Sequence, residues 1–244
     1  MKILIVNDDG IEAPAILQLA KWARKLGEVV VVAPRVEQSG KSQSVLLKEF
    51  FSVEERDLAE GIRAYAVDST PADCVRYGLN ALGEKFDLVL SGINRGLNIG
   101  AELMYSGTAG AATEAVFQGV KALALSSKMS YYDKAVSQMD GIYDYIVKHD
   151  LFAFNDFYNI NIPENPDGRI RITRQGKFRY GDAHEKAGEN LVSIPLGPRL
   201  YEPVPGGEYD IDAVMEGIIS ITPVTLERTN LEVYGKLCNL IAEG

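Results

Sequence analysis

The chain has few of the residues that form disulfides or bind zinc. Its 244 residues include two cysteines, Cys74 and Cys238, and two histidines, His149 and His184. No CxxC pair and no Cys/His ligand spacing occurs, which argues against a zinc site. Two widely separated thiols suit a reducing compartment, so we expect a cytoplasmic protein.

Long apolar runs and excess positive charge are also lacking. No apolar run reaches the roughly 18 residues that a membrane helix needs, and the segment before Asp8 is too short for the apolar region of a signal peptide. The 34 acidic residues outnumber the 25 lysines and arginines, which gives a formal net charge of -9. We therefore expect neither a membrane nor a nucleic acid as a partner. A small phosphorylated substrate is compatible with this charge, because a bound cation supplies local positive charge.

Several familiar catalytic motifs are missing as well. The sequence contains no GxGxxG, no P-loop GxxxxGK[ST] and no GxSxG elbow. Their absence argues against the usual dinucleotide-binding and NTP-hydrolysing folds and against a serine triad.

Strand-like and helix-like segments alternate along the chain. The predicted strands are 3–6, 29–33, 45–53, 63–67, 88–90, 122–126 and 217–222, with further strand material at 159–163 and 169–175. The predicted helices are 13–26, 71–82, 106–118, 131–149 and 226–242. Strands that alternate with crossover-length helices predict an α/β fold with a doubly wound, mostly parallel sheet. The sequence pattern changes after Asn155, and we place a boundary near 165–175. It divides the chain into a core, 1–168, and a C-terminal extension, 169–244, which completes the core.

The best candidate site is the pair of adjacent carboxylates, Asp8 and Asp9, directly after the first predicted strand. Open α/β sheets bind ligands at the carboxyl ends of their strands. Two like charges side by side repel, and a hard divalent cation with oxygen ligands relieves that repulsion. The alternative interpretation of NDDG is an ordinary turn, because Asn, Asp and Gly are turn formers.

Two further loops and one helix start belong to the same predicted edge of the sheet. The loops are QSGKS at 38–42 and SGINRGLNIG at 91–100, and the helix begins at Ser106, Gly107 and Thr108. A helix N-terminus with free backbone N–H groups suits a phosphate. The alternatives are a flexible solvent loop at 91–100 and a plain N-cap at the helix start.

The chain resembles the SurE survival proteins, which are metal-dependent nucleotidases. The matching segments are NDDGIEAP at 7–14, APRVEQSGKS at 33–42, STPADCV at 69–75, DLVLSGINRGLNIG at 87–100, YSGTAGAATEA at 105–115 and DAVMEGIISITP at 212–223. The resemblance implies a Rossmann-like core and a C-terminal hairpin and helix arm that mediates a homodimer or homotetramer. It also implies one divalent metal ion per subunit, Mg²⁺ or Mn²⁺, with the ligands Asp8, Asp9, Ser39 and Asn94. The implied substrates are nucleoside 5'- and 3'-monophosphates, with short polyphosphate as an additional one.

The sequence departs from the family pattern at three places. The family usually has Asp-Arg where this chain has Arg35 and Val36, and glycine where it has Ser69. An expected Thr-Asp near the end is Thr229 and Asn230. None of these changes touches the four implied metal ligands.

The expected reaction is attack of water on a phosphate monoester. Attack by a carboxylate stays open as the alternative, and the missing DxDxT pattern favours water. The implied catalytic residues are Asp8, Asp9 and Asn94, and a carboxylate accepts the proton of the water. The implied phosphate-binding residues are Asn98, Ser106, Gly107 and Thr108. Two alternatives stay open: a non-catalytic nucleotide- or metal-binding regulator, and a nucleoside hydrolase, whose typical DTDxGxDD site has more acids than this one.

Overall fold

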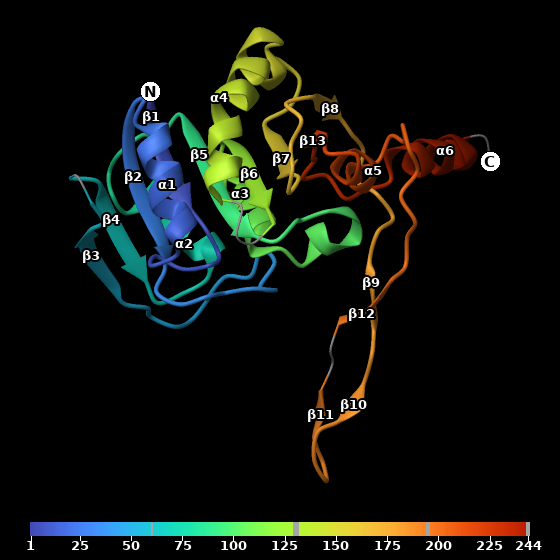
Figure 1. The fold of residues 1–244 in the computed structure, drawn as a ribbon, viewed down its shortest axis with the longest axis horizontal. Coiled ribbons are helices and arrows are strands. Elements are labelled where there is room, and N and C mark those ends of the chain that lie inside the picture. The colour runs from blue at the N-terminus through green and yellow to red at the C-terminus, as the bar shows by residue number, and fades with distance from the viewer. Residues whose placement is uncertain (60, 129–131, 194–195, 243–244) are drawn as a thin grey trace.

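The structure, a computed structural model, describes residues 1–59, 61–128, 132–193 and 196–242. Its centre is a nine-stranded sheet with the strand order β3-β4-β2-β1-β5-β6-β7-β13-β8 (Figure 1). The strands of this sheet are β1 (Lys2–Val6), β2 (Glu28–Pro34), β3 (Val53–Asp57), β4 (Arg63–Val67), β5 (Leu88–Arg95), β6 (Lys121–Ser127), β7 (Phe157–Ile162), β8 (Ile170–Ile172) and β13 (Ile219–Pro223). The six central strands from β4 to β7 pair in parallel, whereas β3 and β13 run antiparallel to β4 and β7. The predicted α/β class with a mostly parallel sheet is therefore confirmed.

Helices cover both faces of the sheet. The helices are α1 (Pro14–Ala23), α2 (Pro71–Asn80), α3 (Gly107–Phe117), α4 (Tyr132–Lys148), α5 (Asp210–Met215) and α6 (Leu231–Ala242), with short 3-10 turns η1 (Gly100–Met104) and η2 (Leu151–Ala153). Along β1, Ile3 and Ile5 pack under α1 and α4, and Leu4 and Val6 pack under α2 and α3. This alternation is the period-two pattern of a strand that is buried on both faces. Among the described residues, no helix is long and apolar enough to cross a membrane.

The prediction of a strand at 45–53 is wrong. Residues 45–52 form no regular structure, and the side chains of Leu47 and Phe50 are exposed. The strand β3 begins where the predicted strand ends, has the acidic sequence VEERD, and pairs antiparallel with β4 at the edge of the sheet. An edge strand leaves many side chains in water, so its sequence need not be apolar. The terminal helix begins at 231 rather than 226, and Tyr131, the predicted start of another helix, lies outside the described residues.

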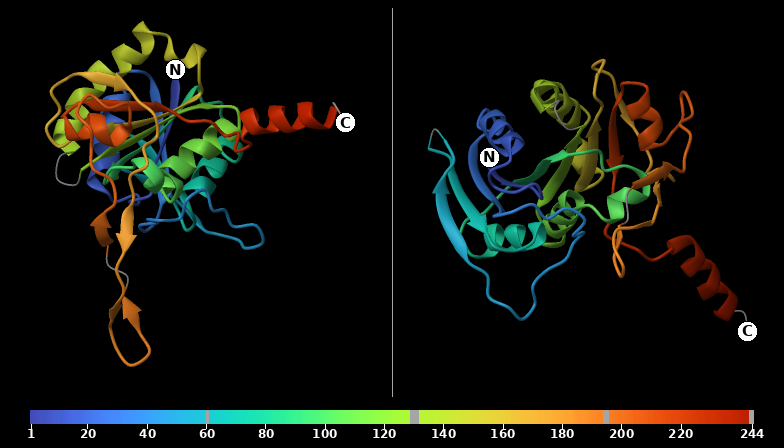
Figure 2. Two further views of the ribbon diagram at one scale, coloured as in Figure 1. Left: turned by 90° about the vertical axis from the view of Figure 1, so that its right-hand side faces the viewer. Right: turned by 60° about the horizontal axis from the view of Figure 1, so that its bottom comes forward.

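Two parts of the C-terminal region project from the body of the molecule. One is a long hairpin of four short strands, β9 (Tyr180–Asp182), β10 (Glu185–Lys186), β11 (Val192–Ser193) and β12 (Leu196–Arg199). The other is α6, which extends away from the sheet in every view (Figures 1 and 2). Between them, β13 returns to the main sheet and lies between β7 and β8.

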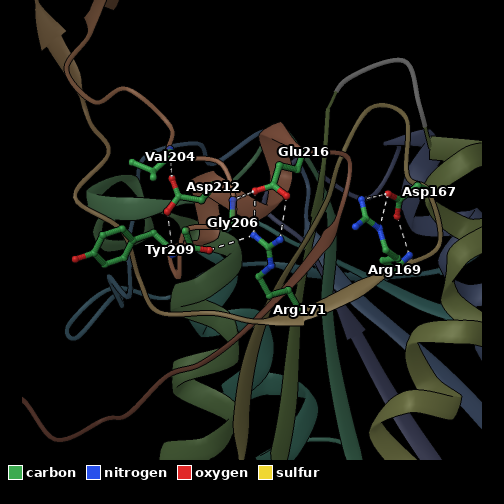
Figure 3. Close-up of polar contacts among 9 residues, drawn as sticks. Asp167, Arg169, Arg171, Val204, Gly206, Tyr209, Asp212 and Glu216 are labelled. Carbon is green, nitrogen blue, oxygen red and sulfur yellow. Dashed lines mark hydrogen bonds and ion pairs between the residues drawn. The ribbon is translucent and has the colours of Figure 1, made fainter.

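Ion pairs and hydrogen bonds attach residues 204–209, which follow this hairpin, to α5 and β8 (Figure 3). Arg171 of β8 contacts the Glu216 carboxylate at the end of α5, at 3.0 and 3.2 Å. The Asp212 carboxylate accepts from the backbone N–H groups of Val204 and Tyr209, at 2.8 and 3.1 Å. The segment that follows the hairpin is thus held against α5 and the edge strand β8.

Candidate functional site

Three separate segments meet at the turn after β1. The backbone N–H of Gln38, in the loop after β2, donates to the Asp8 carbonyl at 2.7 Å. The backbone N–H of Arg95, at the end of β5, donates to Asp9 Oδ2 at 2.9 Å. The Thr108 hydroxyl, at the start of α3, donates to Asp8 Oδ1 at 2.5 Å. The predicted convergence of these segments on the two carboxylates is therefore present.

The NDDG segment is also a turn. Asn7 accepts the Gly10 N–H at 3.1 Å and donates to the Gly10 carbonyl at 2.9 Å. Gly10 has a φ of +101°, which a residue with a Cβ rarely adopts. The turn and the site are thus not alternatives, because the turn holds the two carboxylates in place.

The two carboxylates are held in an unfavourable environment. Asp8 is buried, and that burial raises its pKa despite the hydrogen bond from Thr108. Burial, with the neighbouring Asp8 charge second, raises the pKa of Asp9 to about 6. The Glu37 carboxylate raises the pKa of both further. This excess of negative charge makes the position favourable for a cation.

The two neutral ligands that the resemblance implies are chain neighbours of residues that bond to this pair: Ser39 follows Gln38, and Asn94 precedes Arg95. Ser39 is exposed and donates its hydroxyl to Glu37 at 2.7 Å, which leaves lone pairs on its oxygen. Asn94 uses its Nδ2 group on the Gly96 carbonyl at 2.9 Å, so its Oδ1 is the atom suited to a cation. In the described part of the chain no group of three or more His, Cys, Asp and Glu side chains could hold a metal. Two carboxylates with a hydroxyl and an amide oxygen nevertheless form a hard donor set, which fits Mg²⁺ or Mn²⁺.

The start of α3 lies directly against Asp8. A Cβ built on Gly107 would lie 2.9 Å from Asp8 Oδ2, so only glycine allows this approach. Ser106 caps the helix by accepting the Ala109 N–H at 3.0 Å, and its own hydroxyl hydrogen is left for a ligand. The hydroxyl hydrogen of Thr108 is used on Asp8. The Thr108 hydroxyl thus orients a carboxylate, whereas the predicted phosphate contact of Gly107 and Thr108 uses their backbone N–H groups and stays a prediction.

Asn98 lies in a buried amide network rather than at the carboxylates. Its Nδ2 donates to Ser126 Oγ at 2.8 Å, and its backbone N–H donates to Asn161 Oδ1 at 2.8 Å. Its carbonyl accepts from Asn159 and Asn161 of β7, at 2.8 and 3.0 Å. The network anchors the loop that follows β5, and its sequence signal is two asparagines at alternate positions of a buried strand.

Sequence reasoning missed three side chains around Asp9. They are Glu37, Arg95 and Tyr132. Burial, and after it the Asp9 charge, raises the pKa of Tyr132 to about 12, whereas the Arg95 charge lowers it. The phenol and the guanidinium are thus close enough to sense Asp9. The histidines lie elsewhere, since His149 packs on Tyr145 with ring centroids 4.4 Å apart and His184 is exposed on the hairpin.

The chain is similar to known proteins over nearly its whole length. The family model described as Survival protein SurE matches residues 3–182. The protein named 5'-nucleotidase SurE from Thermosipho africanus is 36% identical, over 97% of this chain and 96% of that protein. The protein of the same name from Syntrophotalea carbinolica is 38% identical, over 96% and 95%. The crystal structure of the SurE protein from Aquifex aeolicus matches with a TM-score of 0.80 and 30% identity, over 98% of this chain and 99% of that one.

Proposed function

This chain belongs to the SurE survival protein family, and from that premise we propose how its residues carry out nucleotide hydrolysis. The chain is a 5'-nucleotidase. We propose that Asp8, Asp9, Ser39 and Asn94 hold one Mg²⁺ or Mn²⁺ ion, and that nucleoside 5'- and 3'-monophosphates and short polyphosphate are substrates. The observation that supports the metal site most strongly is that the loops carrying Ser39 and Asn94 meet the two adjacent carboxylates, since the neighbouring Gln38 and Arg95 donate backbone N–H groups to Asp8 and Asp9.

The proposed mechanism needs positioning and charge more than covalent chemistry. A bound cation would neutralise charge on the phosphate and lower the pKa of the attacking water. Asp9 is the better proton acceptor, because it is only half-buried whereas Asp8 is buried and bonded to Thr108. The N-terminus of α3, with the Ser106 hydroxyl and the Gly107 backbone, would hold the phosphate oxygens.

We further propose that residues 169–244 mediate a homodimer or homotetramer. The apolar side chains of α6 are exposed in the single chain, with exposed fractions of 63% for Leu231, 53% for Leu237 and 70% for Leu240. A helix with such a face is stable in water only when it packs against another surface. Since both cysteines are free thiols, we also propose a cytoplasmic location.

The test is phosphate release from AMP by the purified chain, with and without EDTA. We expect release with Mg²⁺ or Mn²⁺, none in EDTA, and recovery when metal is added back. Asp8→Asn and Asp9→Asn should each lower kcat by orders of magnitude, whereas Asp144→Asn, an exposed acid on α4, should not. Release of free base instead of phosphate would identify a nucleoside hydrolase, and release of neither would identify a binding protein.

A further inference from the structure

One residue near the proposed metal site has a strained backbone. Ser42 lies in the connection from β2 to β3, residues 35–52, which contains no helix or strand. Its φ is +53°, in the left-handed region that residues with a side chain rarely adopt. Such a conformation persists only where surrounding contacts enforce it, and it is common at functional sites. The contacts that enforce it here join Ser42 to the segment before α3.

Two hydrogen bonds fix Ser42 to the residues that precede α3. Its backbone N–H donates to the Tyr105 carbonyl at 3.0 Å, and its hydroxyl donates to the Met104 carbonyl at 2.9 Å. The residue after Tyr105 is Ser106, which caps α3. Ser42 therefore bonds to the chain immediately before the proposed phosphate site.

The body of α3 also packs directly on this part of the loop. A Cβ built on Gly110 would lie 2.1 Å from the Ser42 carbonyl oxygen, so only glycine permits this approach. One turn farther along α3, the buried Glu114 carboxylate accepts the Gln43 side-chain amide at 3.0 Å. These contacts restrict Ser42 from several sides and so keep it in its left-handed conformation.

Ser42 and Gln38 anchor the two ends of the short turn that carries Ser39. Gln38 donates its backbone N–H to the Asp8 carbonyl at 2.7 Å. Asp8 in turn accepts the Thr108 hydroxyl at the start of α3, and Ser42 is bonded to the residues just before that helix. The turn and the carboxylate are thus attached to the same helix start, and the position of Ser39 relative to Asp8 depends on the Ser42 contacts.

We propose that Ser42 is a positioning residue for Ser39 in the proposed metal site. Its hydroxyl, bonded to the Met104 carbonyl, holds the Ser39 turn against the start of α3, where Asp8 is also held. The proposal rests on the proposed function, and it adds a residue that acts through Ser39 rather than on the substrate.

The test measures Mn²⁺ affinity directly, by electron paramagnetic resonance titration, in Ser42→Ala and Ser42→Gly. Both variants lose the hydroxyl, so we expect the dissociation constant for Mn²⁺ to rise about 3- to 10-fold in each, the usual effect of one lost hydrogen bond. The two variants differ in strain, because glycine adopts a φ of +53° freely and alanine does not. Ser42→Gly should therefore have the higher Tm, yet still bind Mn²⁺ more weakly than wild type. Wild-type affinity in Ser42→Gly would show that strain, and not the hydroxyl, matters, and would overturn the proposal.

A double variant shows whether Ser42 acts through Ser39. In a Ser39→Ala background, Ser42→Ala should not weaken Mn²⁺ binding further, because the side chain that Ser42 positions is already gone. The matched control is Ser44→Ala, an exposed serine of the same loop that accepts the Thr70 hydroxyl with its backbone carbonyl. That carbonyl is kept in the control, so its Mn²⁺ affinity should equal that of wild type.

The outcomes separate the positioning role from the activity. Mn²⁺ affinity within about twofold of wild type in Ser42→Ala, or losses that add in the double variant, would overturn the role of Ser42 and leave the nucleotidase intact. Wild-type affinity in Ser39→Ala would overturn the proposed ligand set, and no phosphate from AMP with wild type and added metal would overturn the proposed function itself. Circular dichroism of each variant shows whether the fold is kept.

Discussion

Asp9→Asn should make the metal-free protein more stable while it abolishes the response to metal. A carboxyl group whose pKa rises from 3.8 to about 6 on folding lowers the free energy of unfolding by up to about 3 kcal/mol when it is ionised. Asp9 is only half-buried, and solvent screening reduces this to about 1–2 kcal/mol. The amide of asparagine can still accept the Arg95 N–H. For a chain of this size we expect a rise in Tm of about 2–8 °C in EDTA at pH 7.

The pH dependence of stability independently checks that ionised Asp9 destabilises the folded protein. Because folding raises the pKa of Asp9, the folded state binds this proton more tightly than the unfolded chain does. Stability therefore falls as the pH rises from about 4 to about 6, and the advantage of Asp9→Asn should shrink as the pH is lowered through that range. Calorimetry of wild type, Asp9→Asn and the exposed control Asp144→Asn, each with and without Mn²⁺, measures these differences. If Asp9→Asn in EDTA is no more stable than wild type, the ionised carboxylate does not destabilise the folded protein, and the argument for the cation site fails.

The other predictions concern the start of α3, the C-terminal helix and the range of substrates. Thr108→Val removes the hydrogen bond to Asp8 and should lower kcat/KM about 10- to 100-fold, whereas Thr108→Ser should keep most of the activity; equal kinetics for the two variants would contradict the role of the hydroxyl. Gly107→Ala places a Cβ 2.9 Å from the Asp8 carboxylate and should impair activity, while Gly141→Ala, with no atom within 4 Å of its Cβ, should not. Truncation after Arg228 removes α6 and should convert the assembly to monomers in sedimentation. A full chain that already sediments as a monomer at micromolar concentration would contradict the proposed assembly. Across a panel of nucleoside monophosphates kcat/KM should vary by about two orders of magnitude, and a preference for one base above about 10⁴-fold would require a base-reading pocket.

Local sequence signals are sufficient for the fold class and for the identity of the central carboxylates. The apolar alternation in β1 and the turn residues after it are signals of this kind, because strand burial and turn geometry depend on neighbouring residues. They place Asp8 and Asp9 at the carboxyl end of a parallel strand from the order of residues alone. The helix start at Ser106 can be predicted for the same reason, since an N-cap depends only on residues within one helical turn of it.

Which distant groups meet depends instead on how the whole chain packs. Residues 45–52 have a strand-like composition but find no partner strand, and the acidic β3 pairs instead, because pairing depends on neighbours in space. The insertion of β13 between β7 and β8 follows from long-range register in the same way. Thr108 could equally have faced a phosphate, and only the packing of α3 turns its hydroxyl to Asp8. The hydrogen bond from the Ala101 N–H to the Phe178 carbonyl joins the segment after β5 to the chain just before the hairpin, a contact that no local pattern encodes.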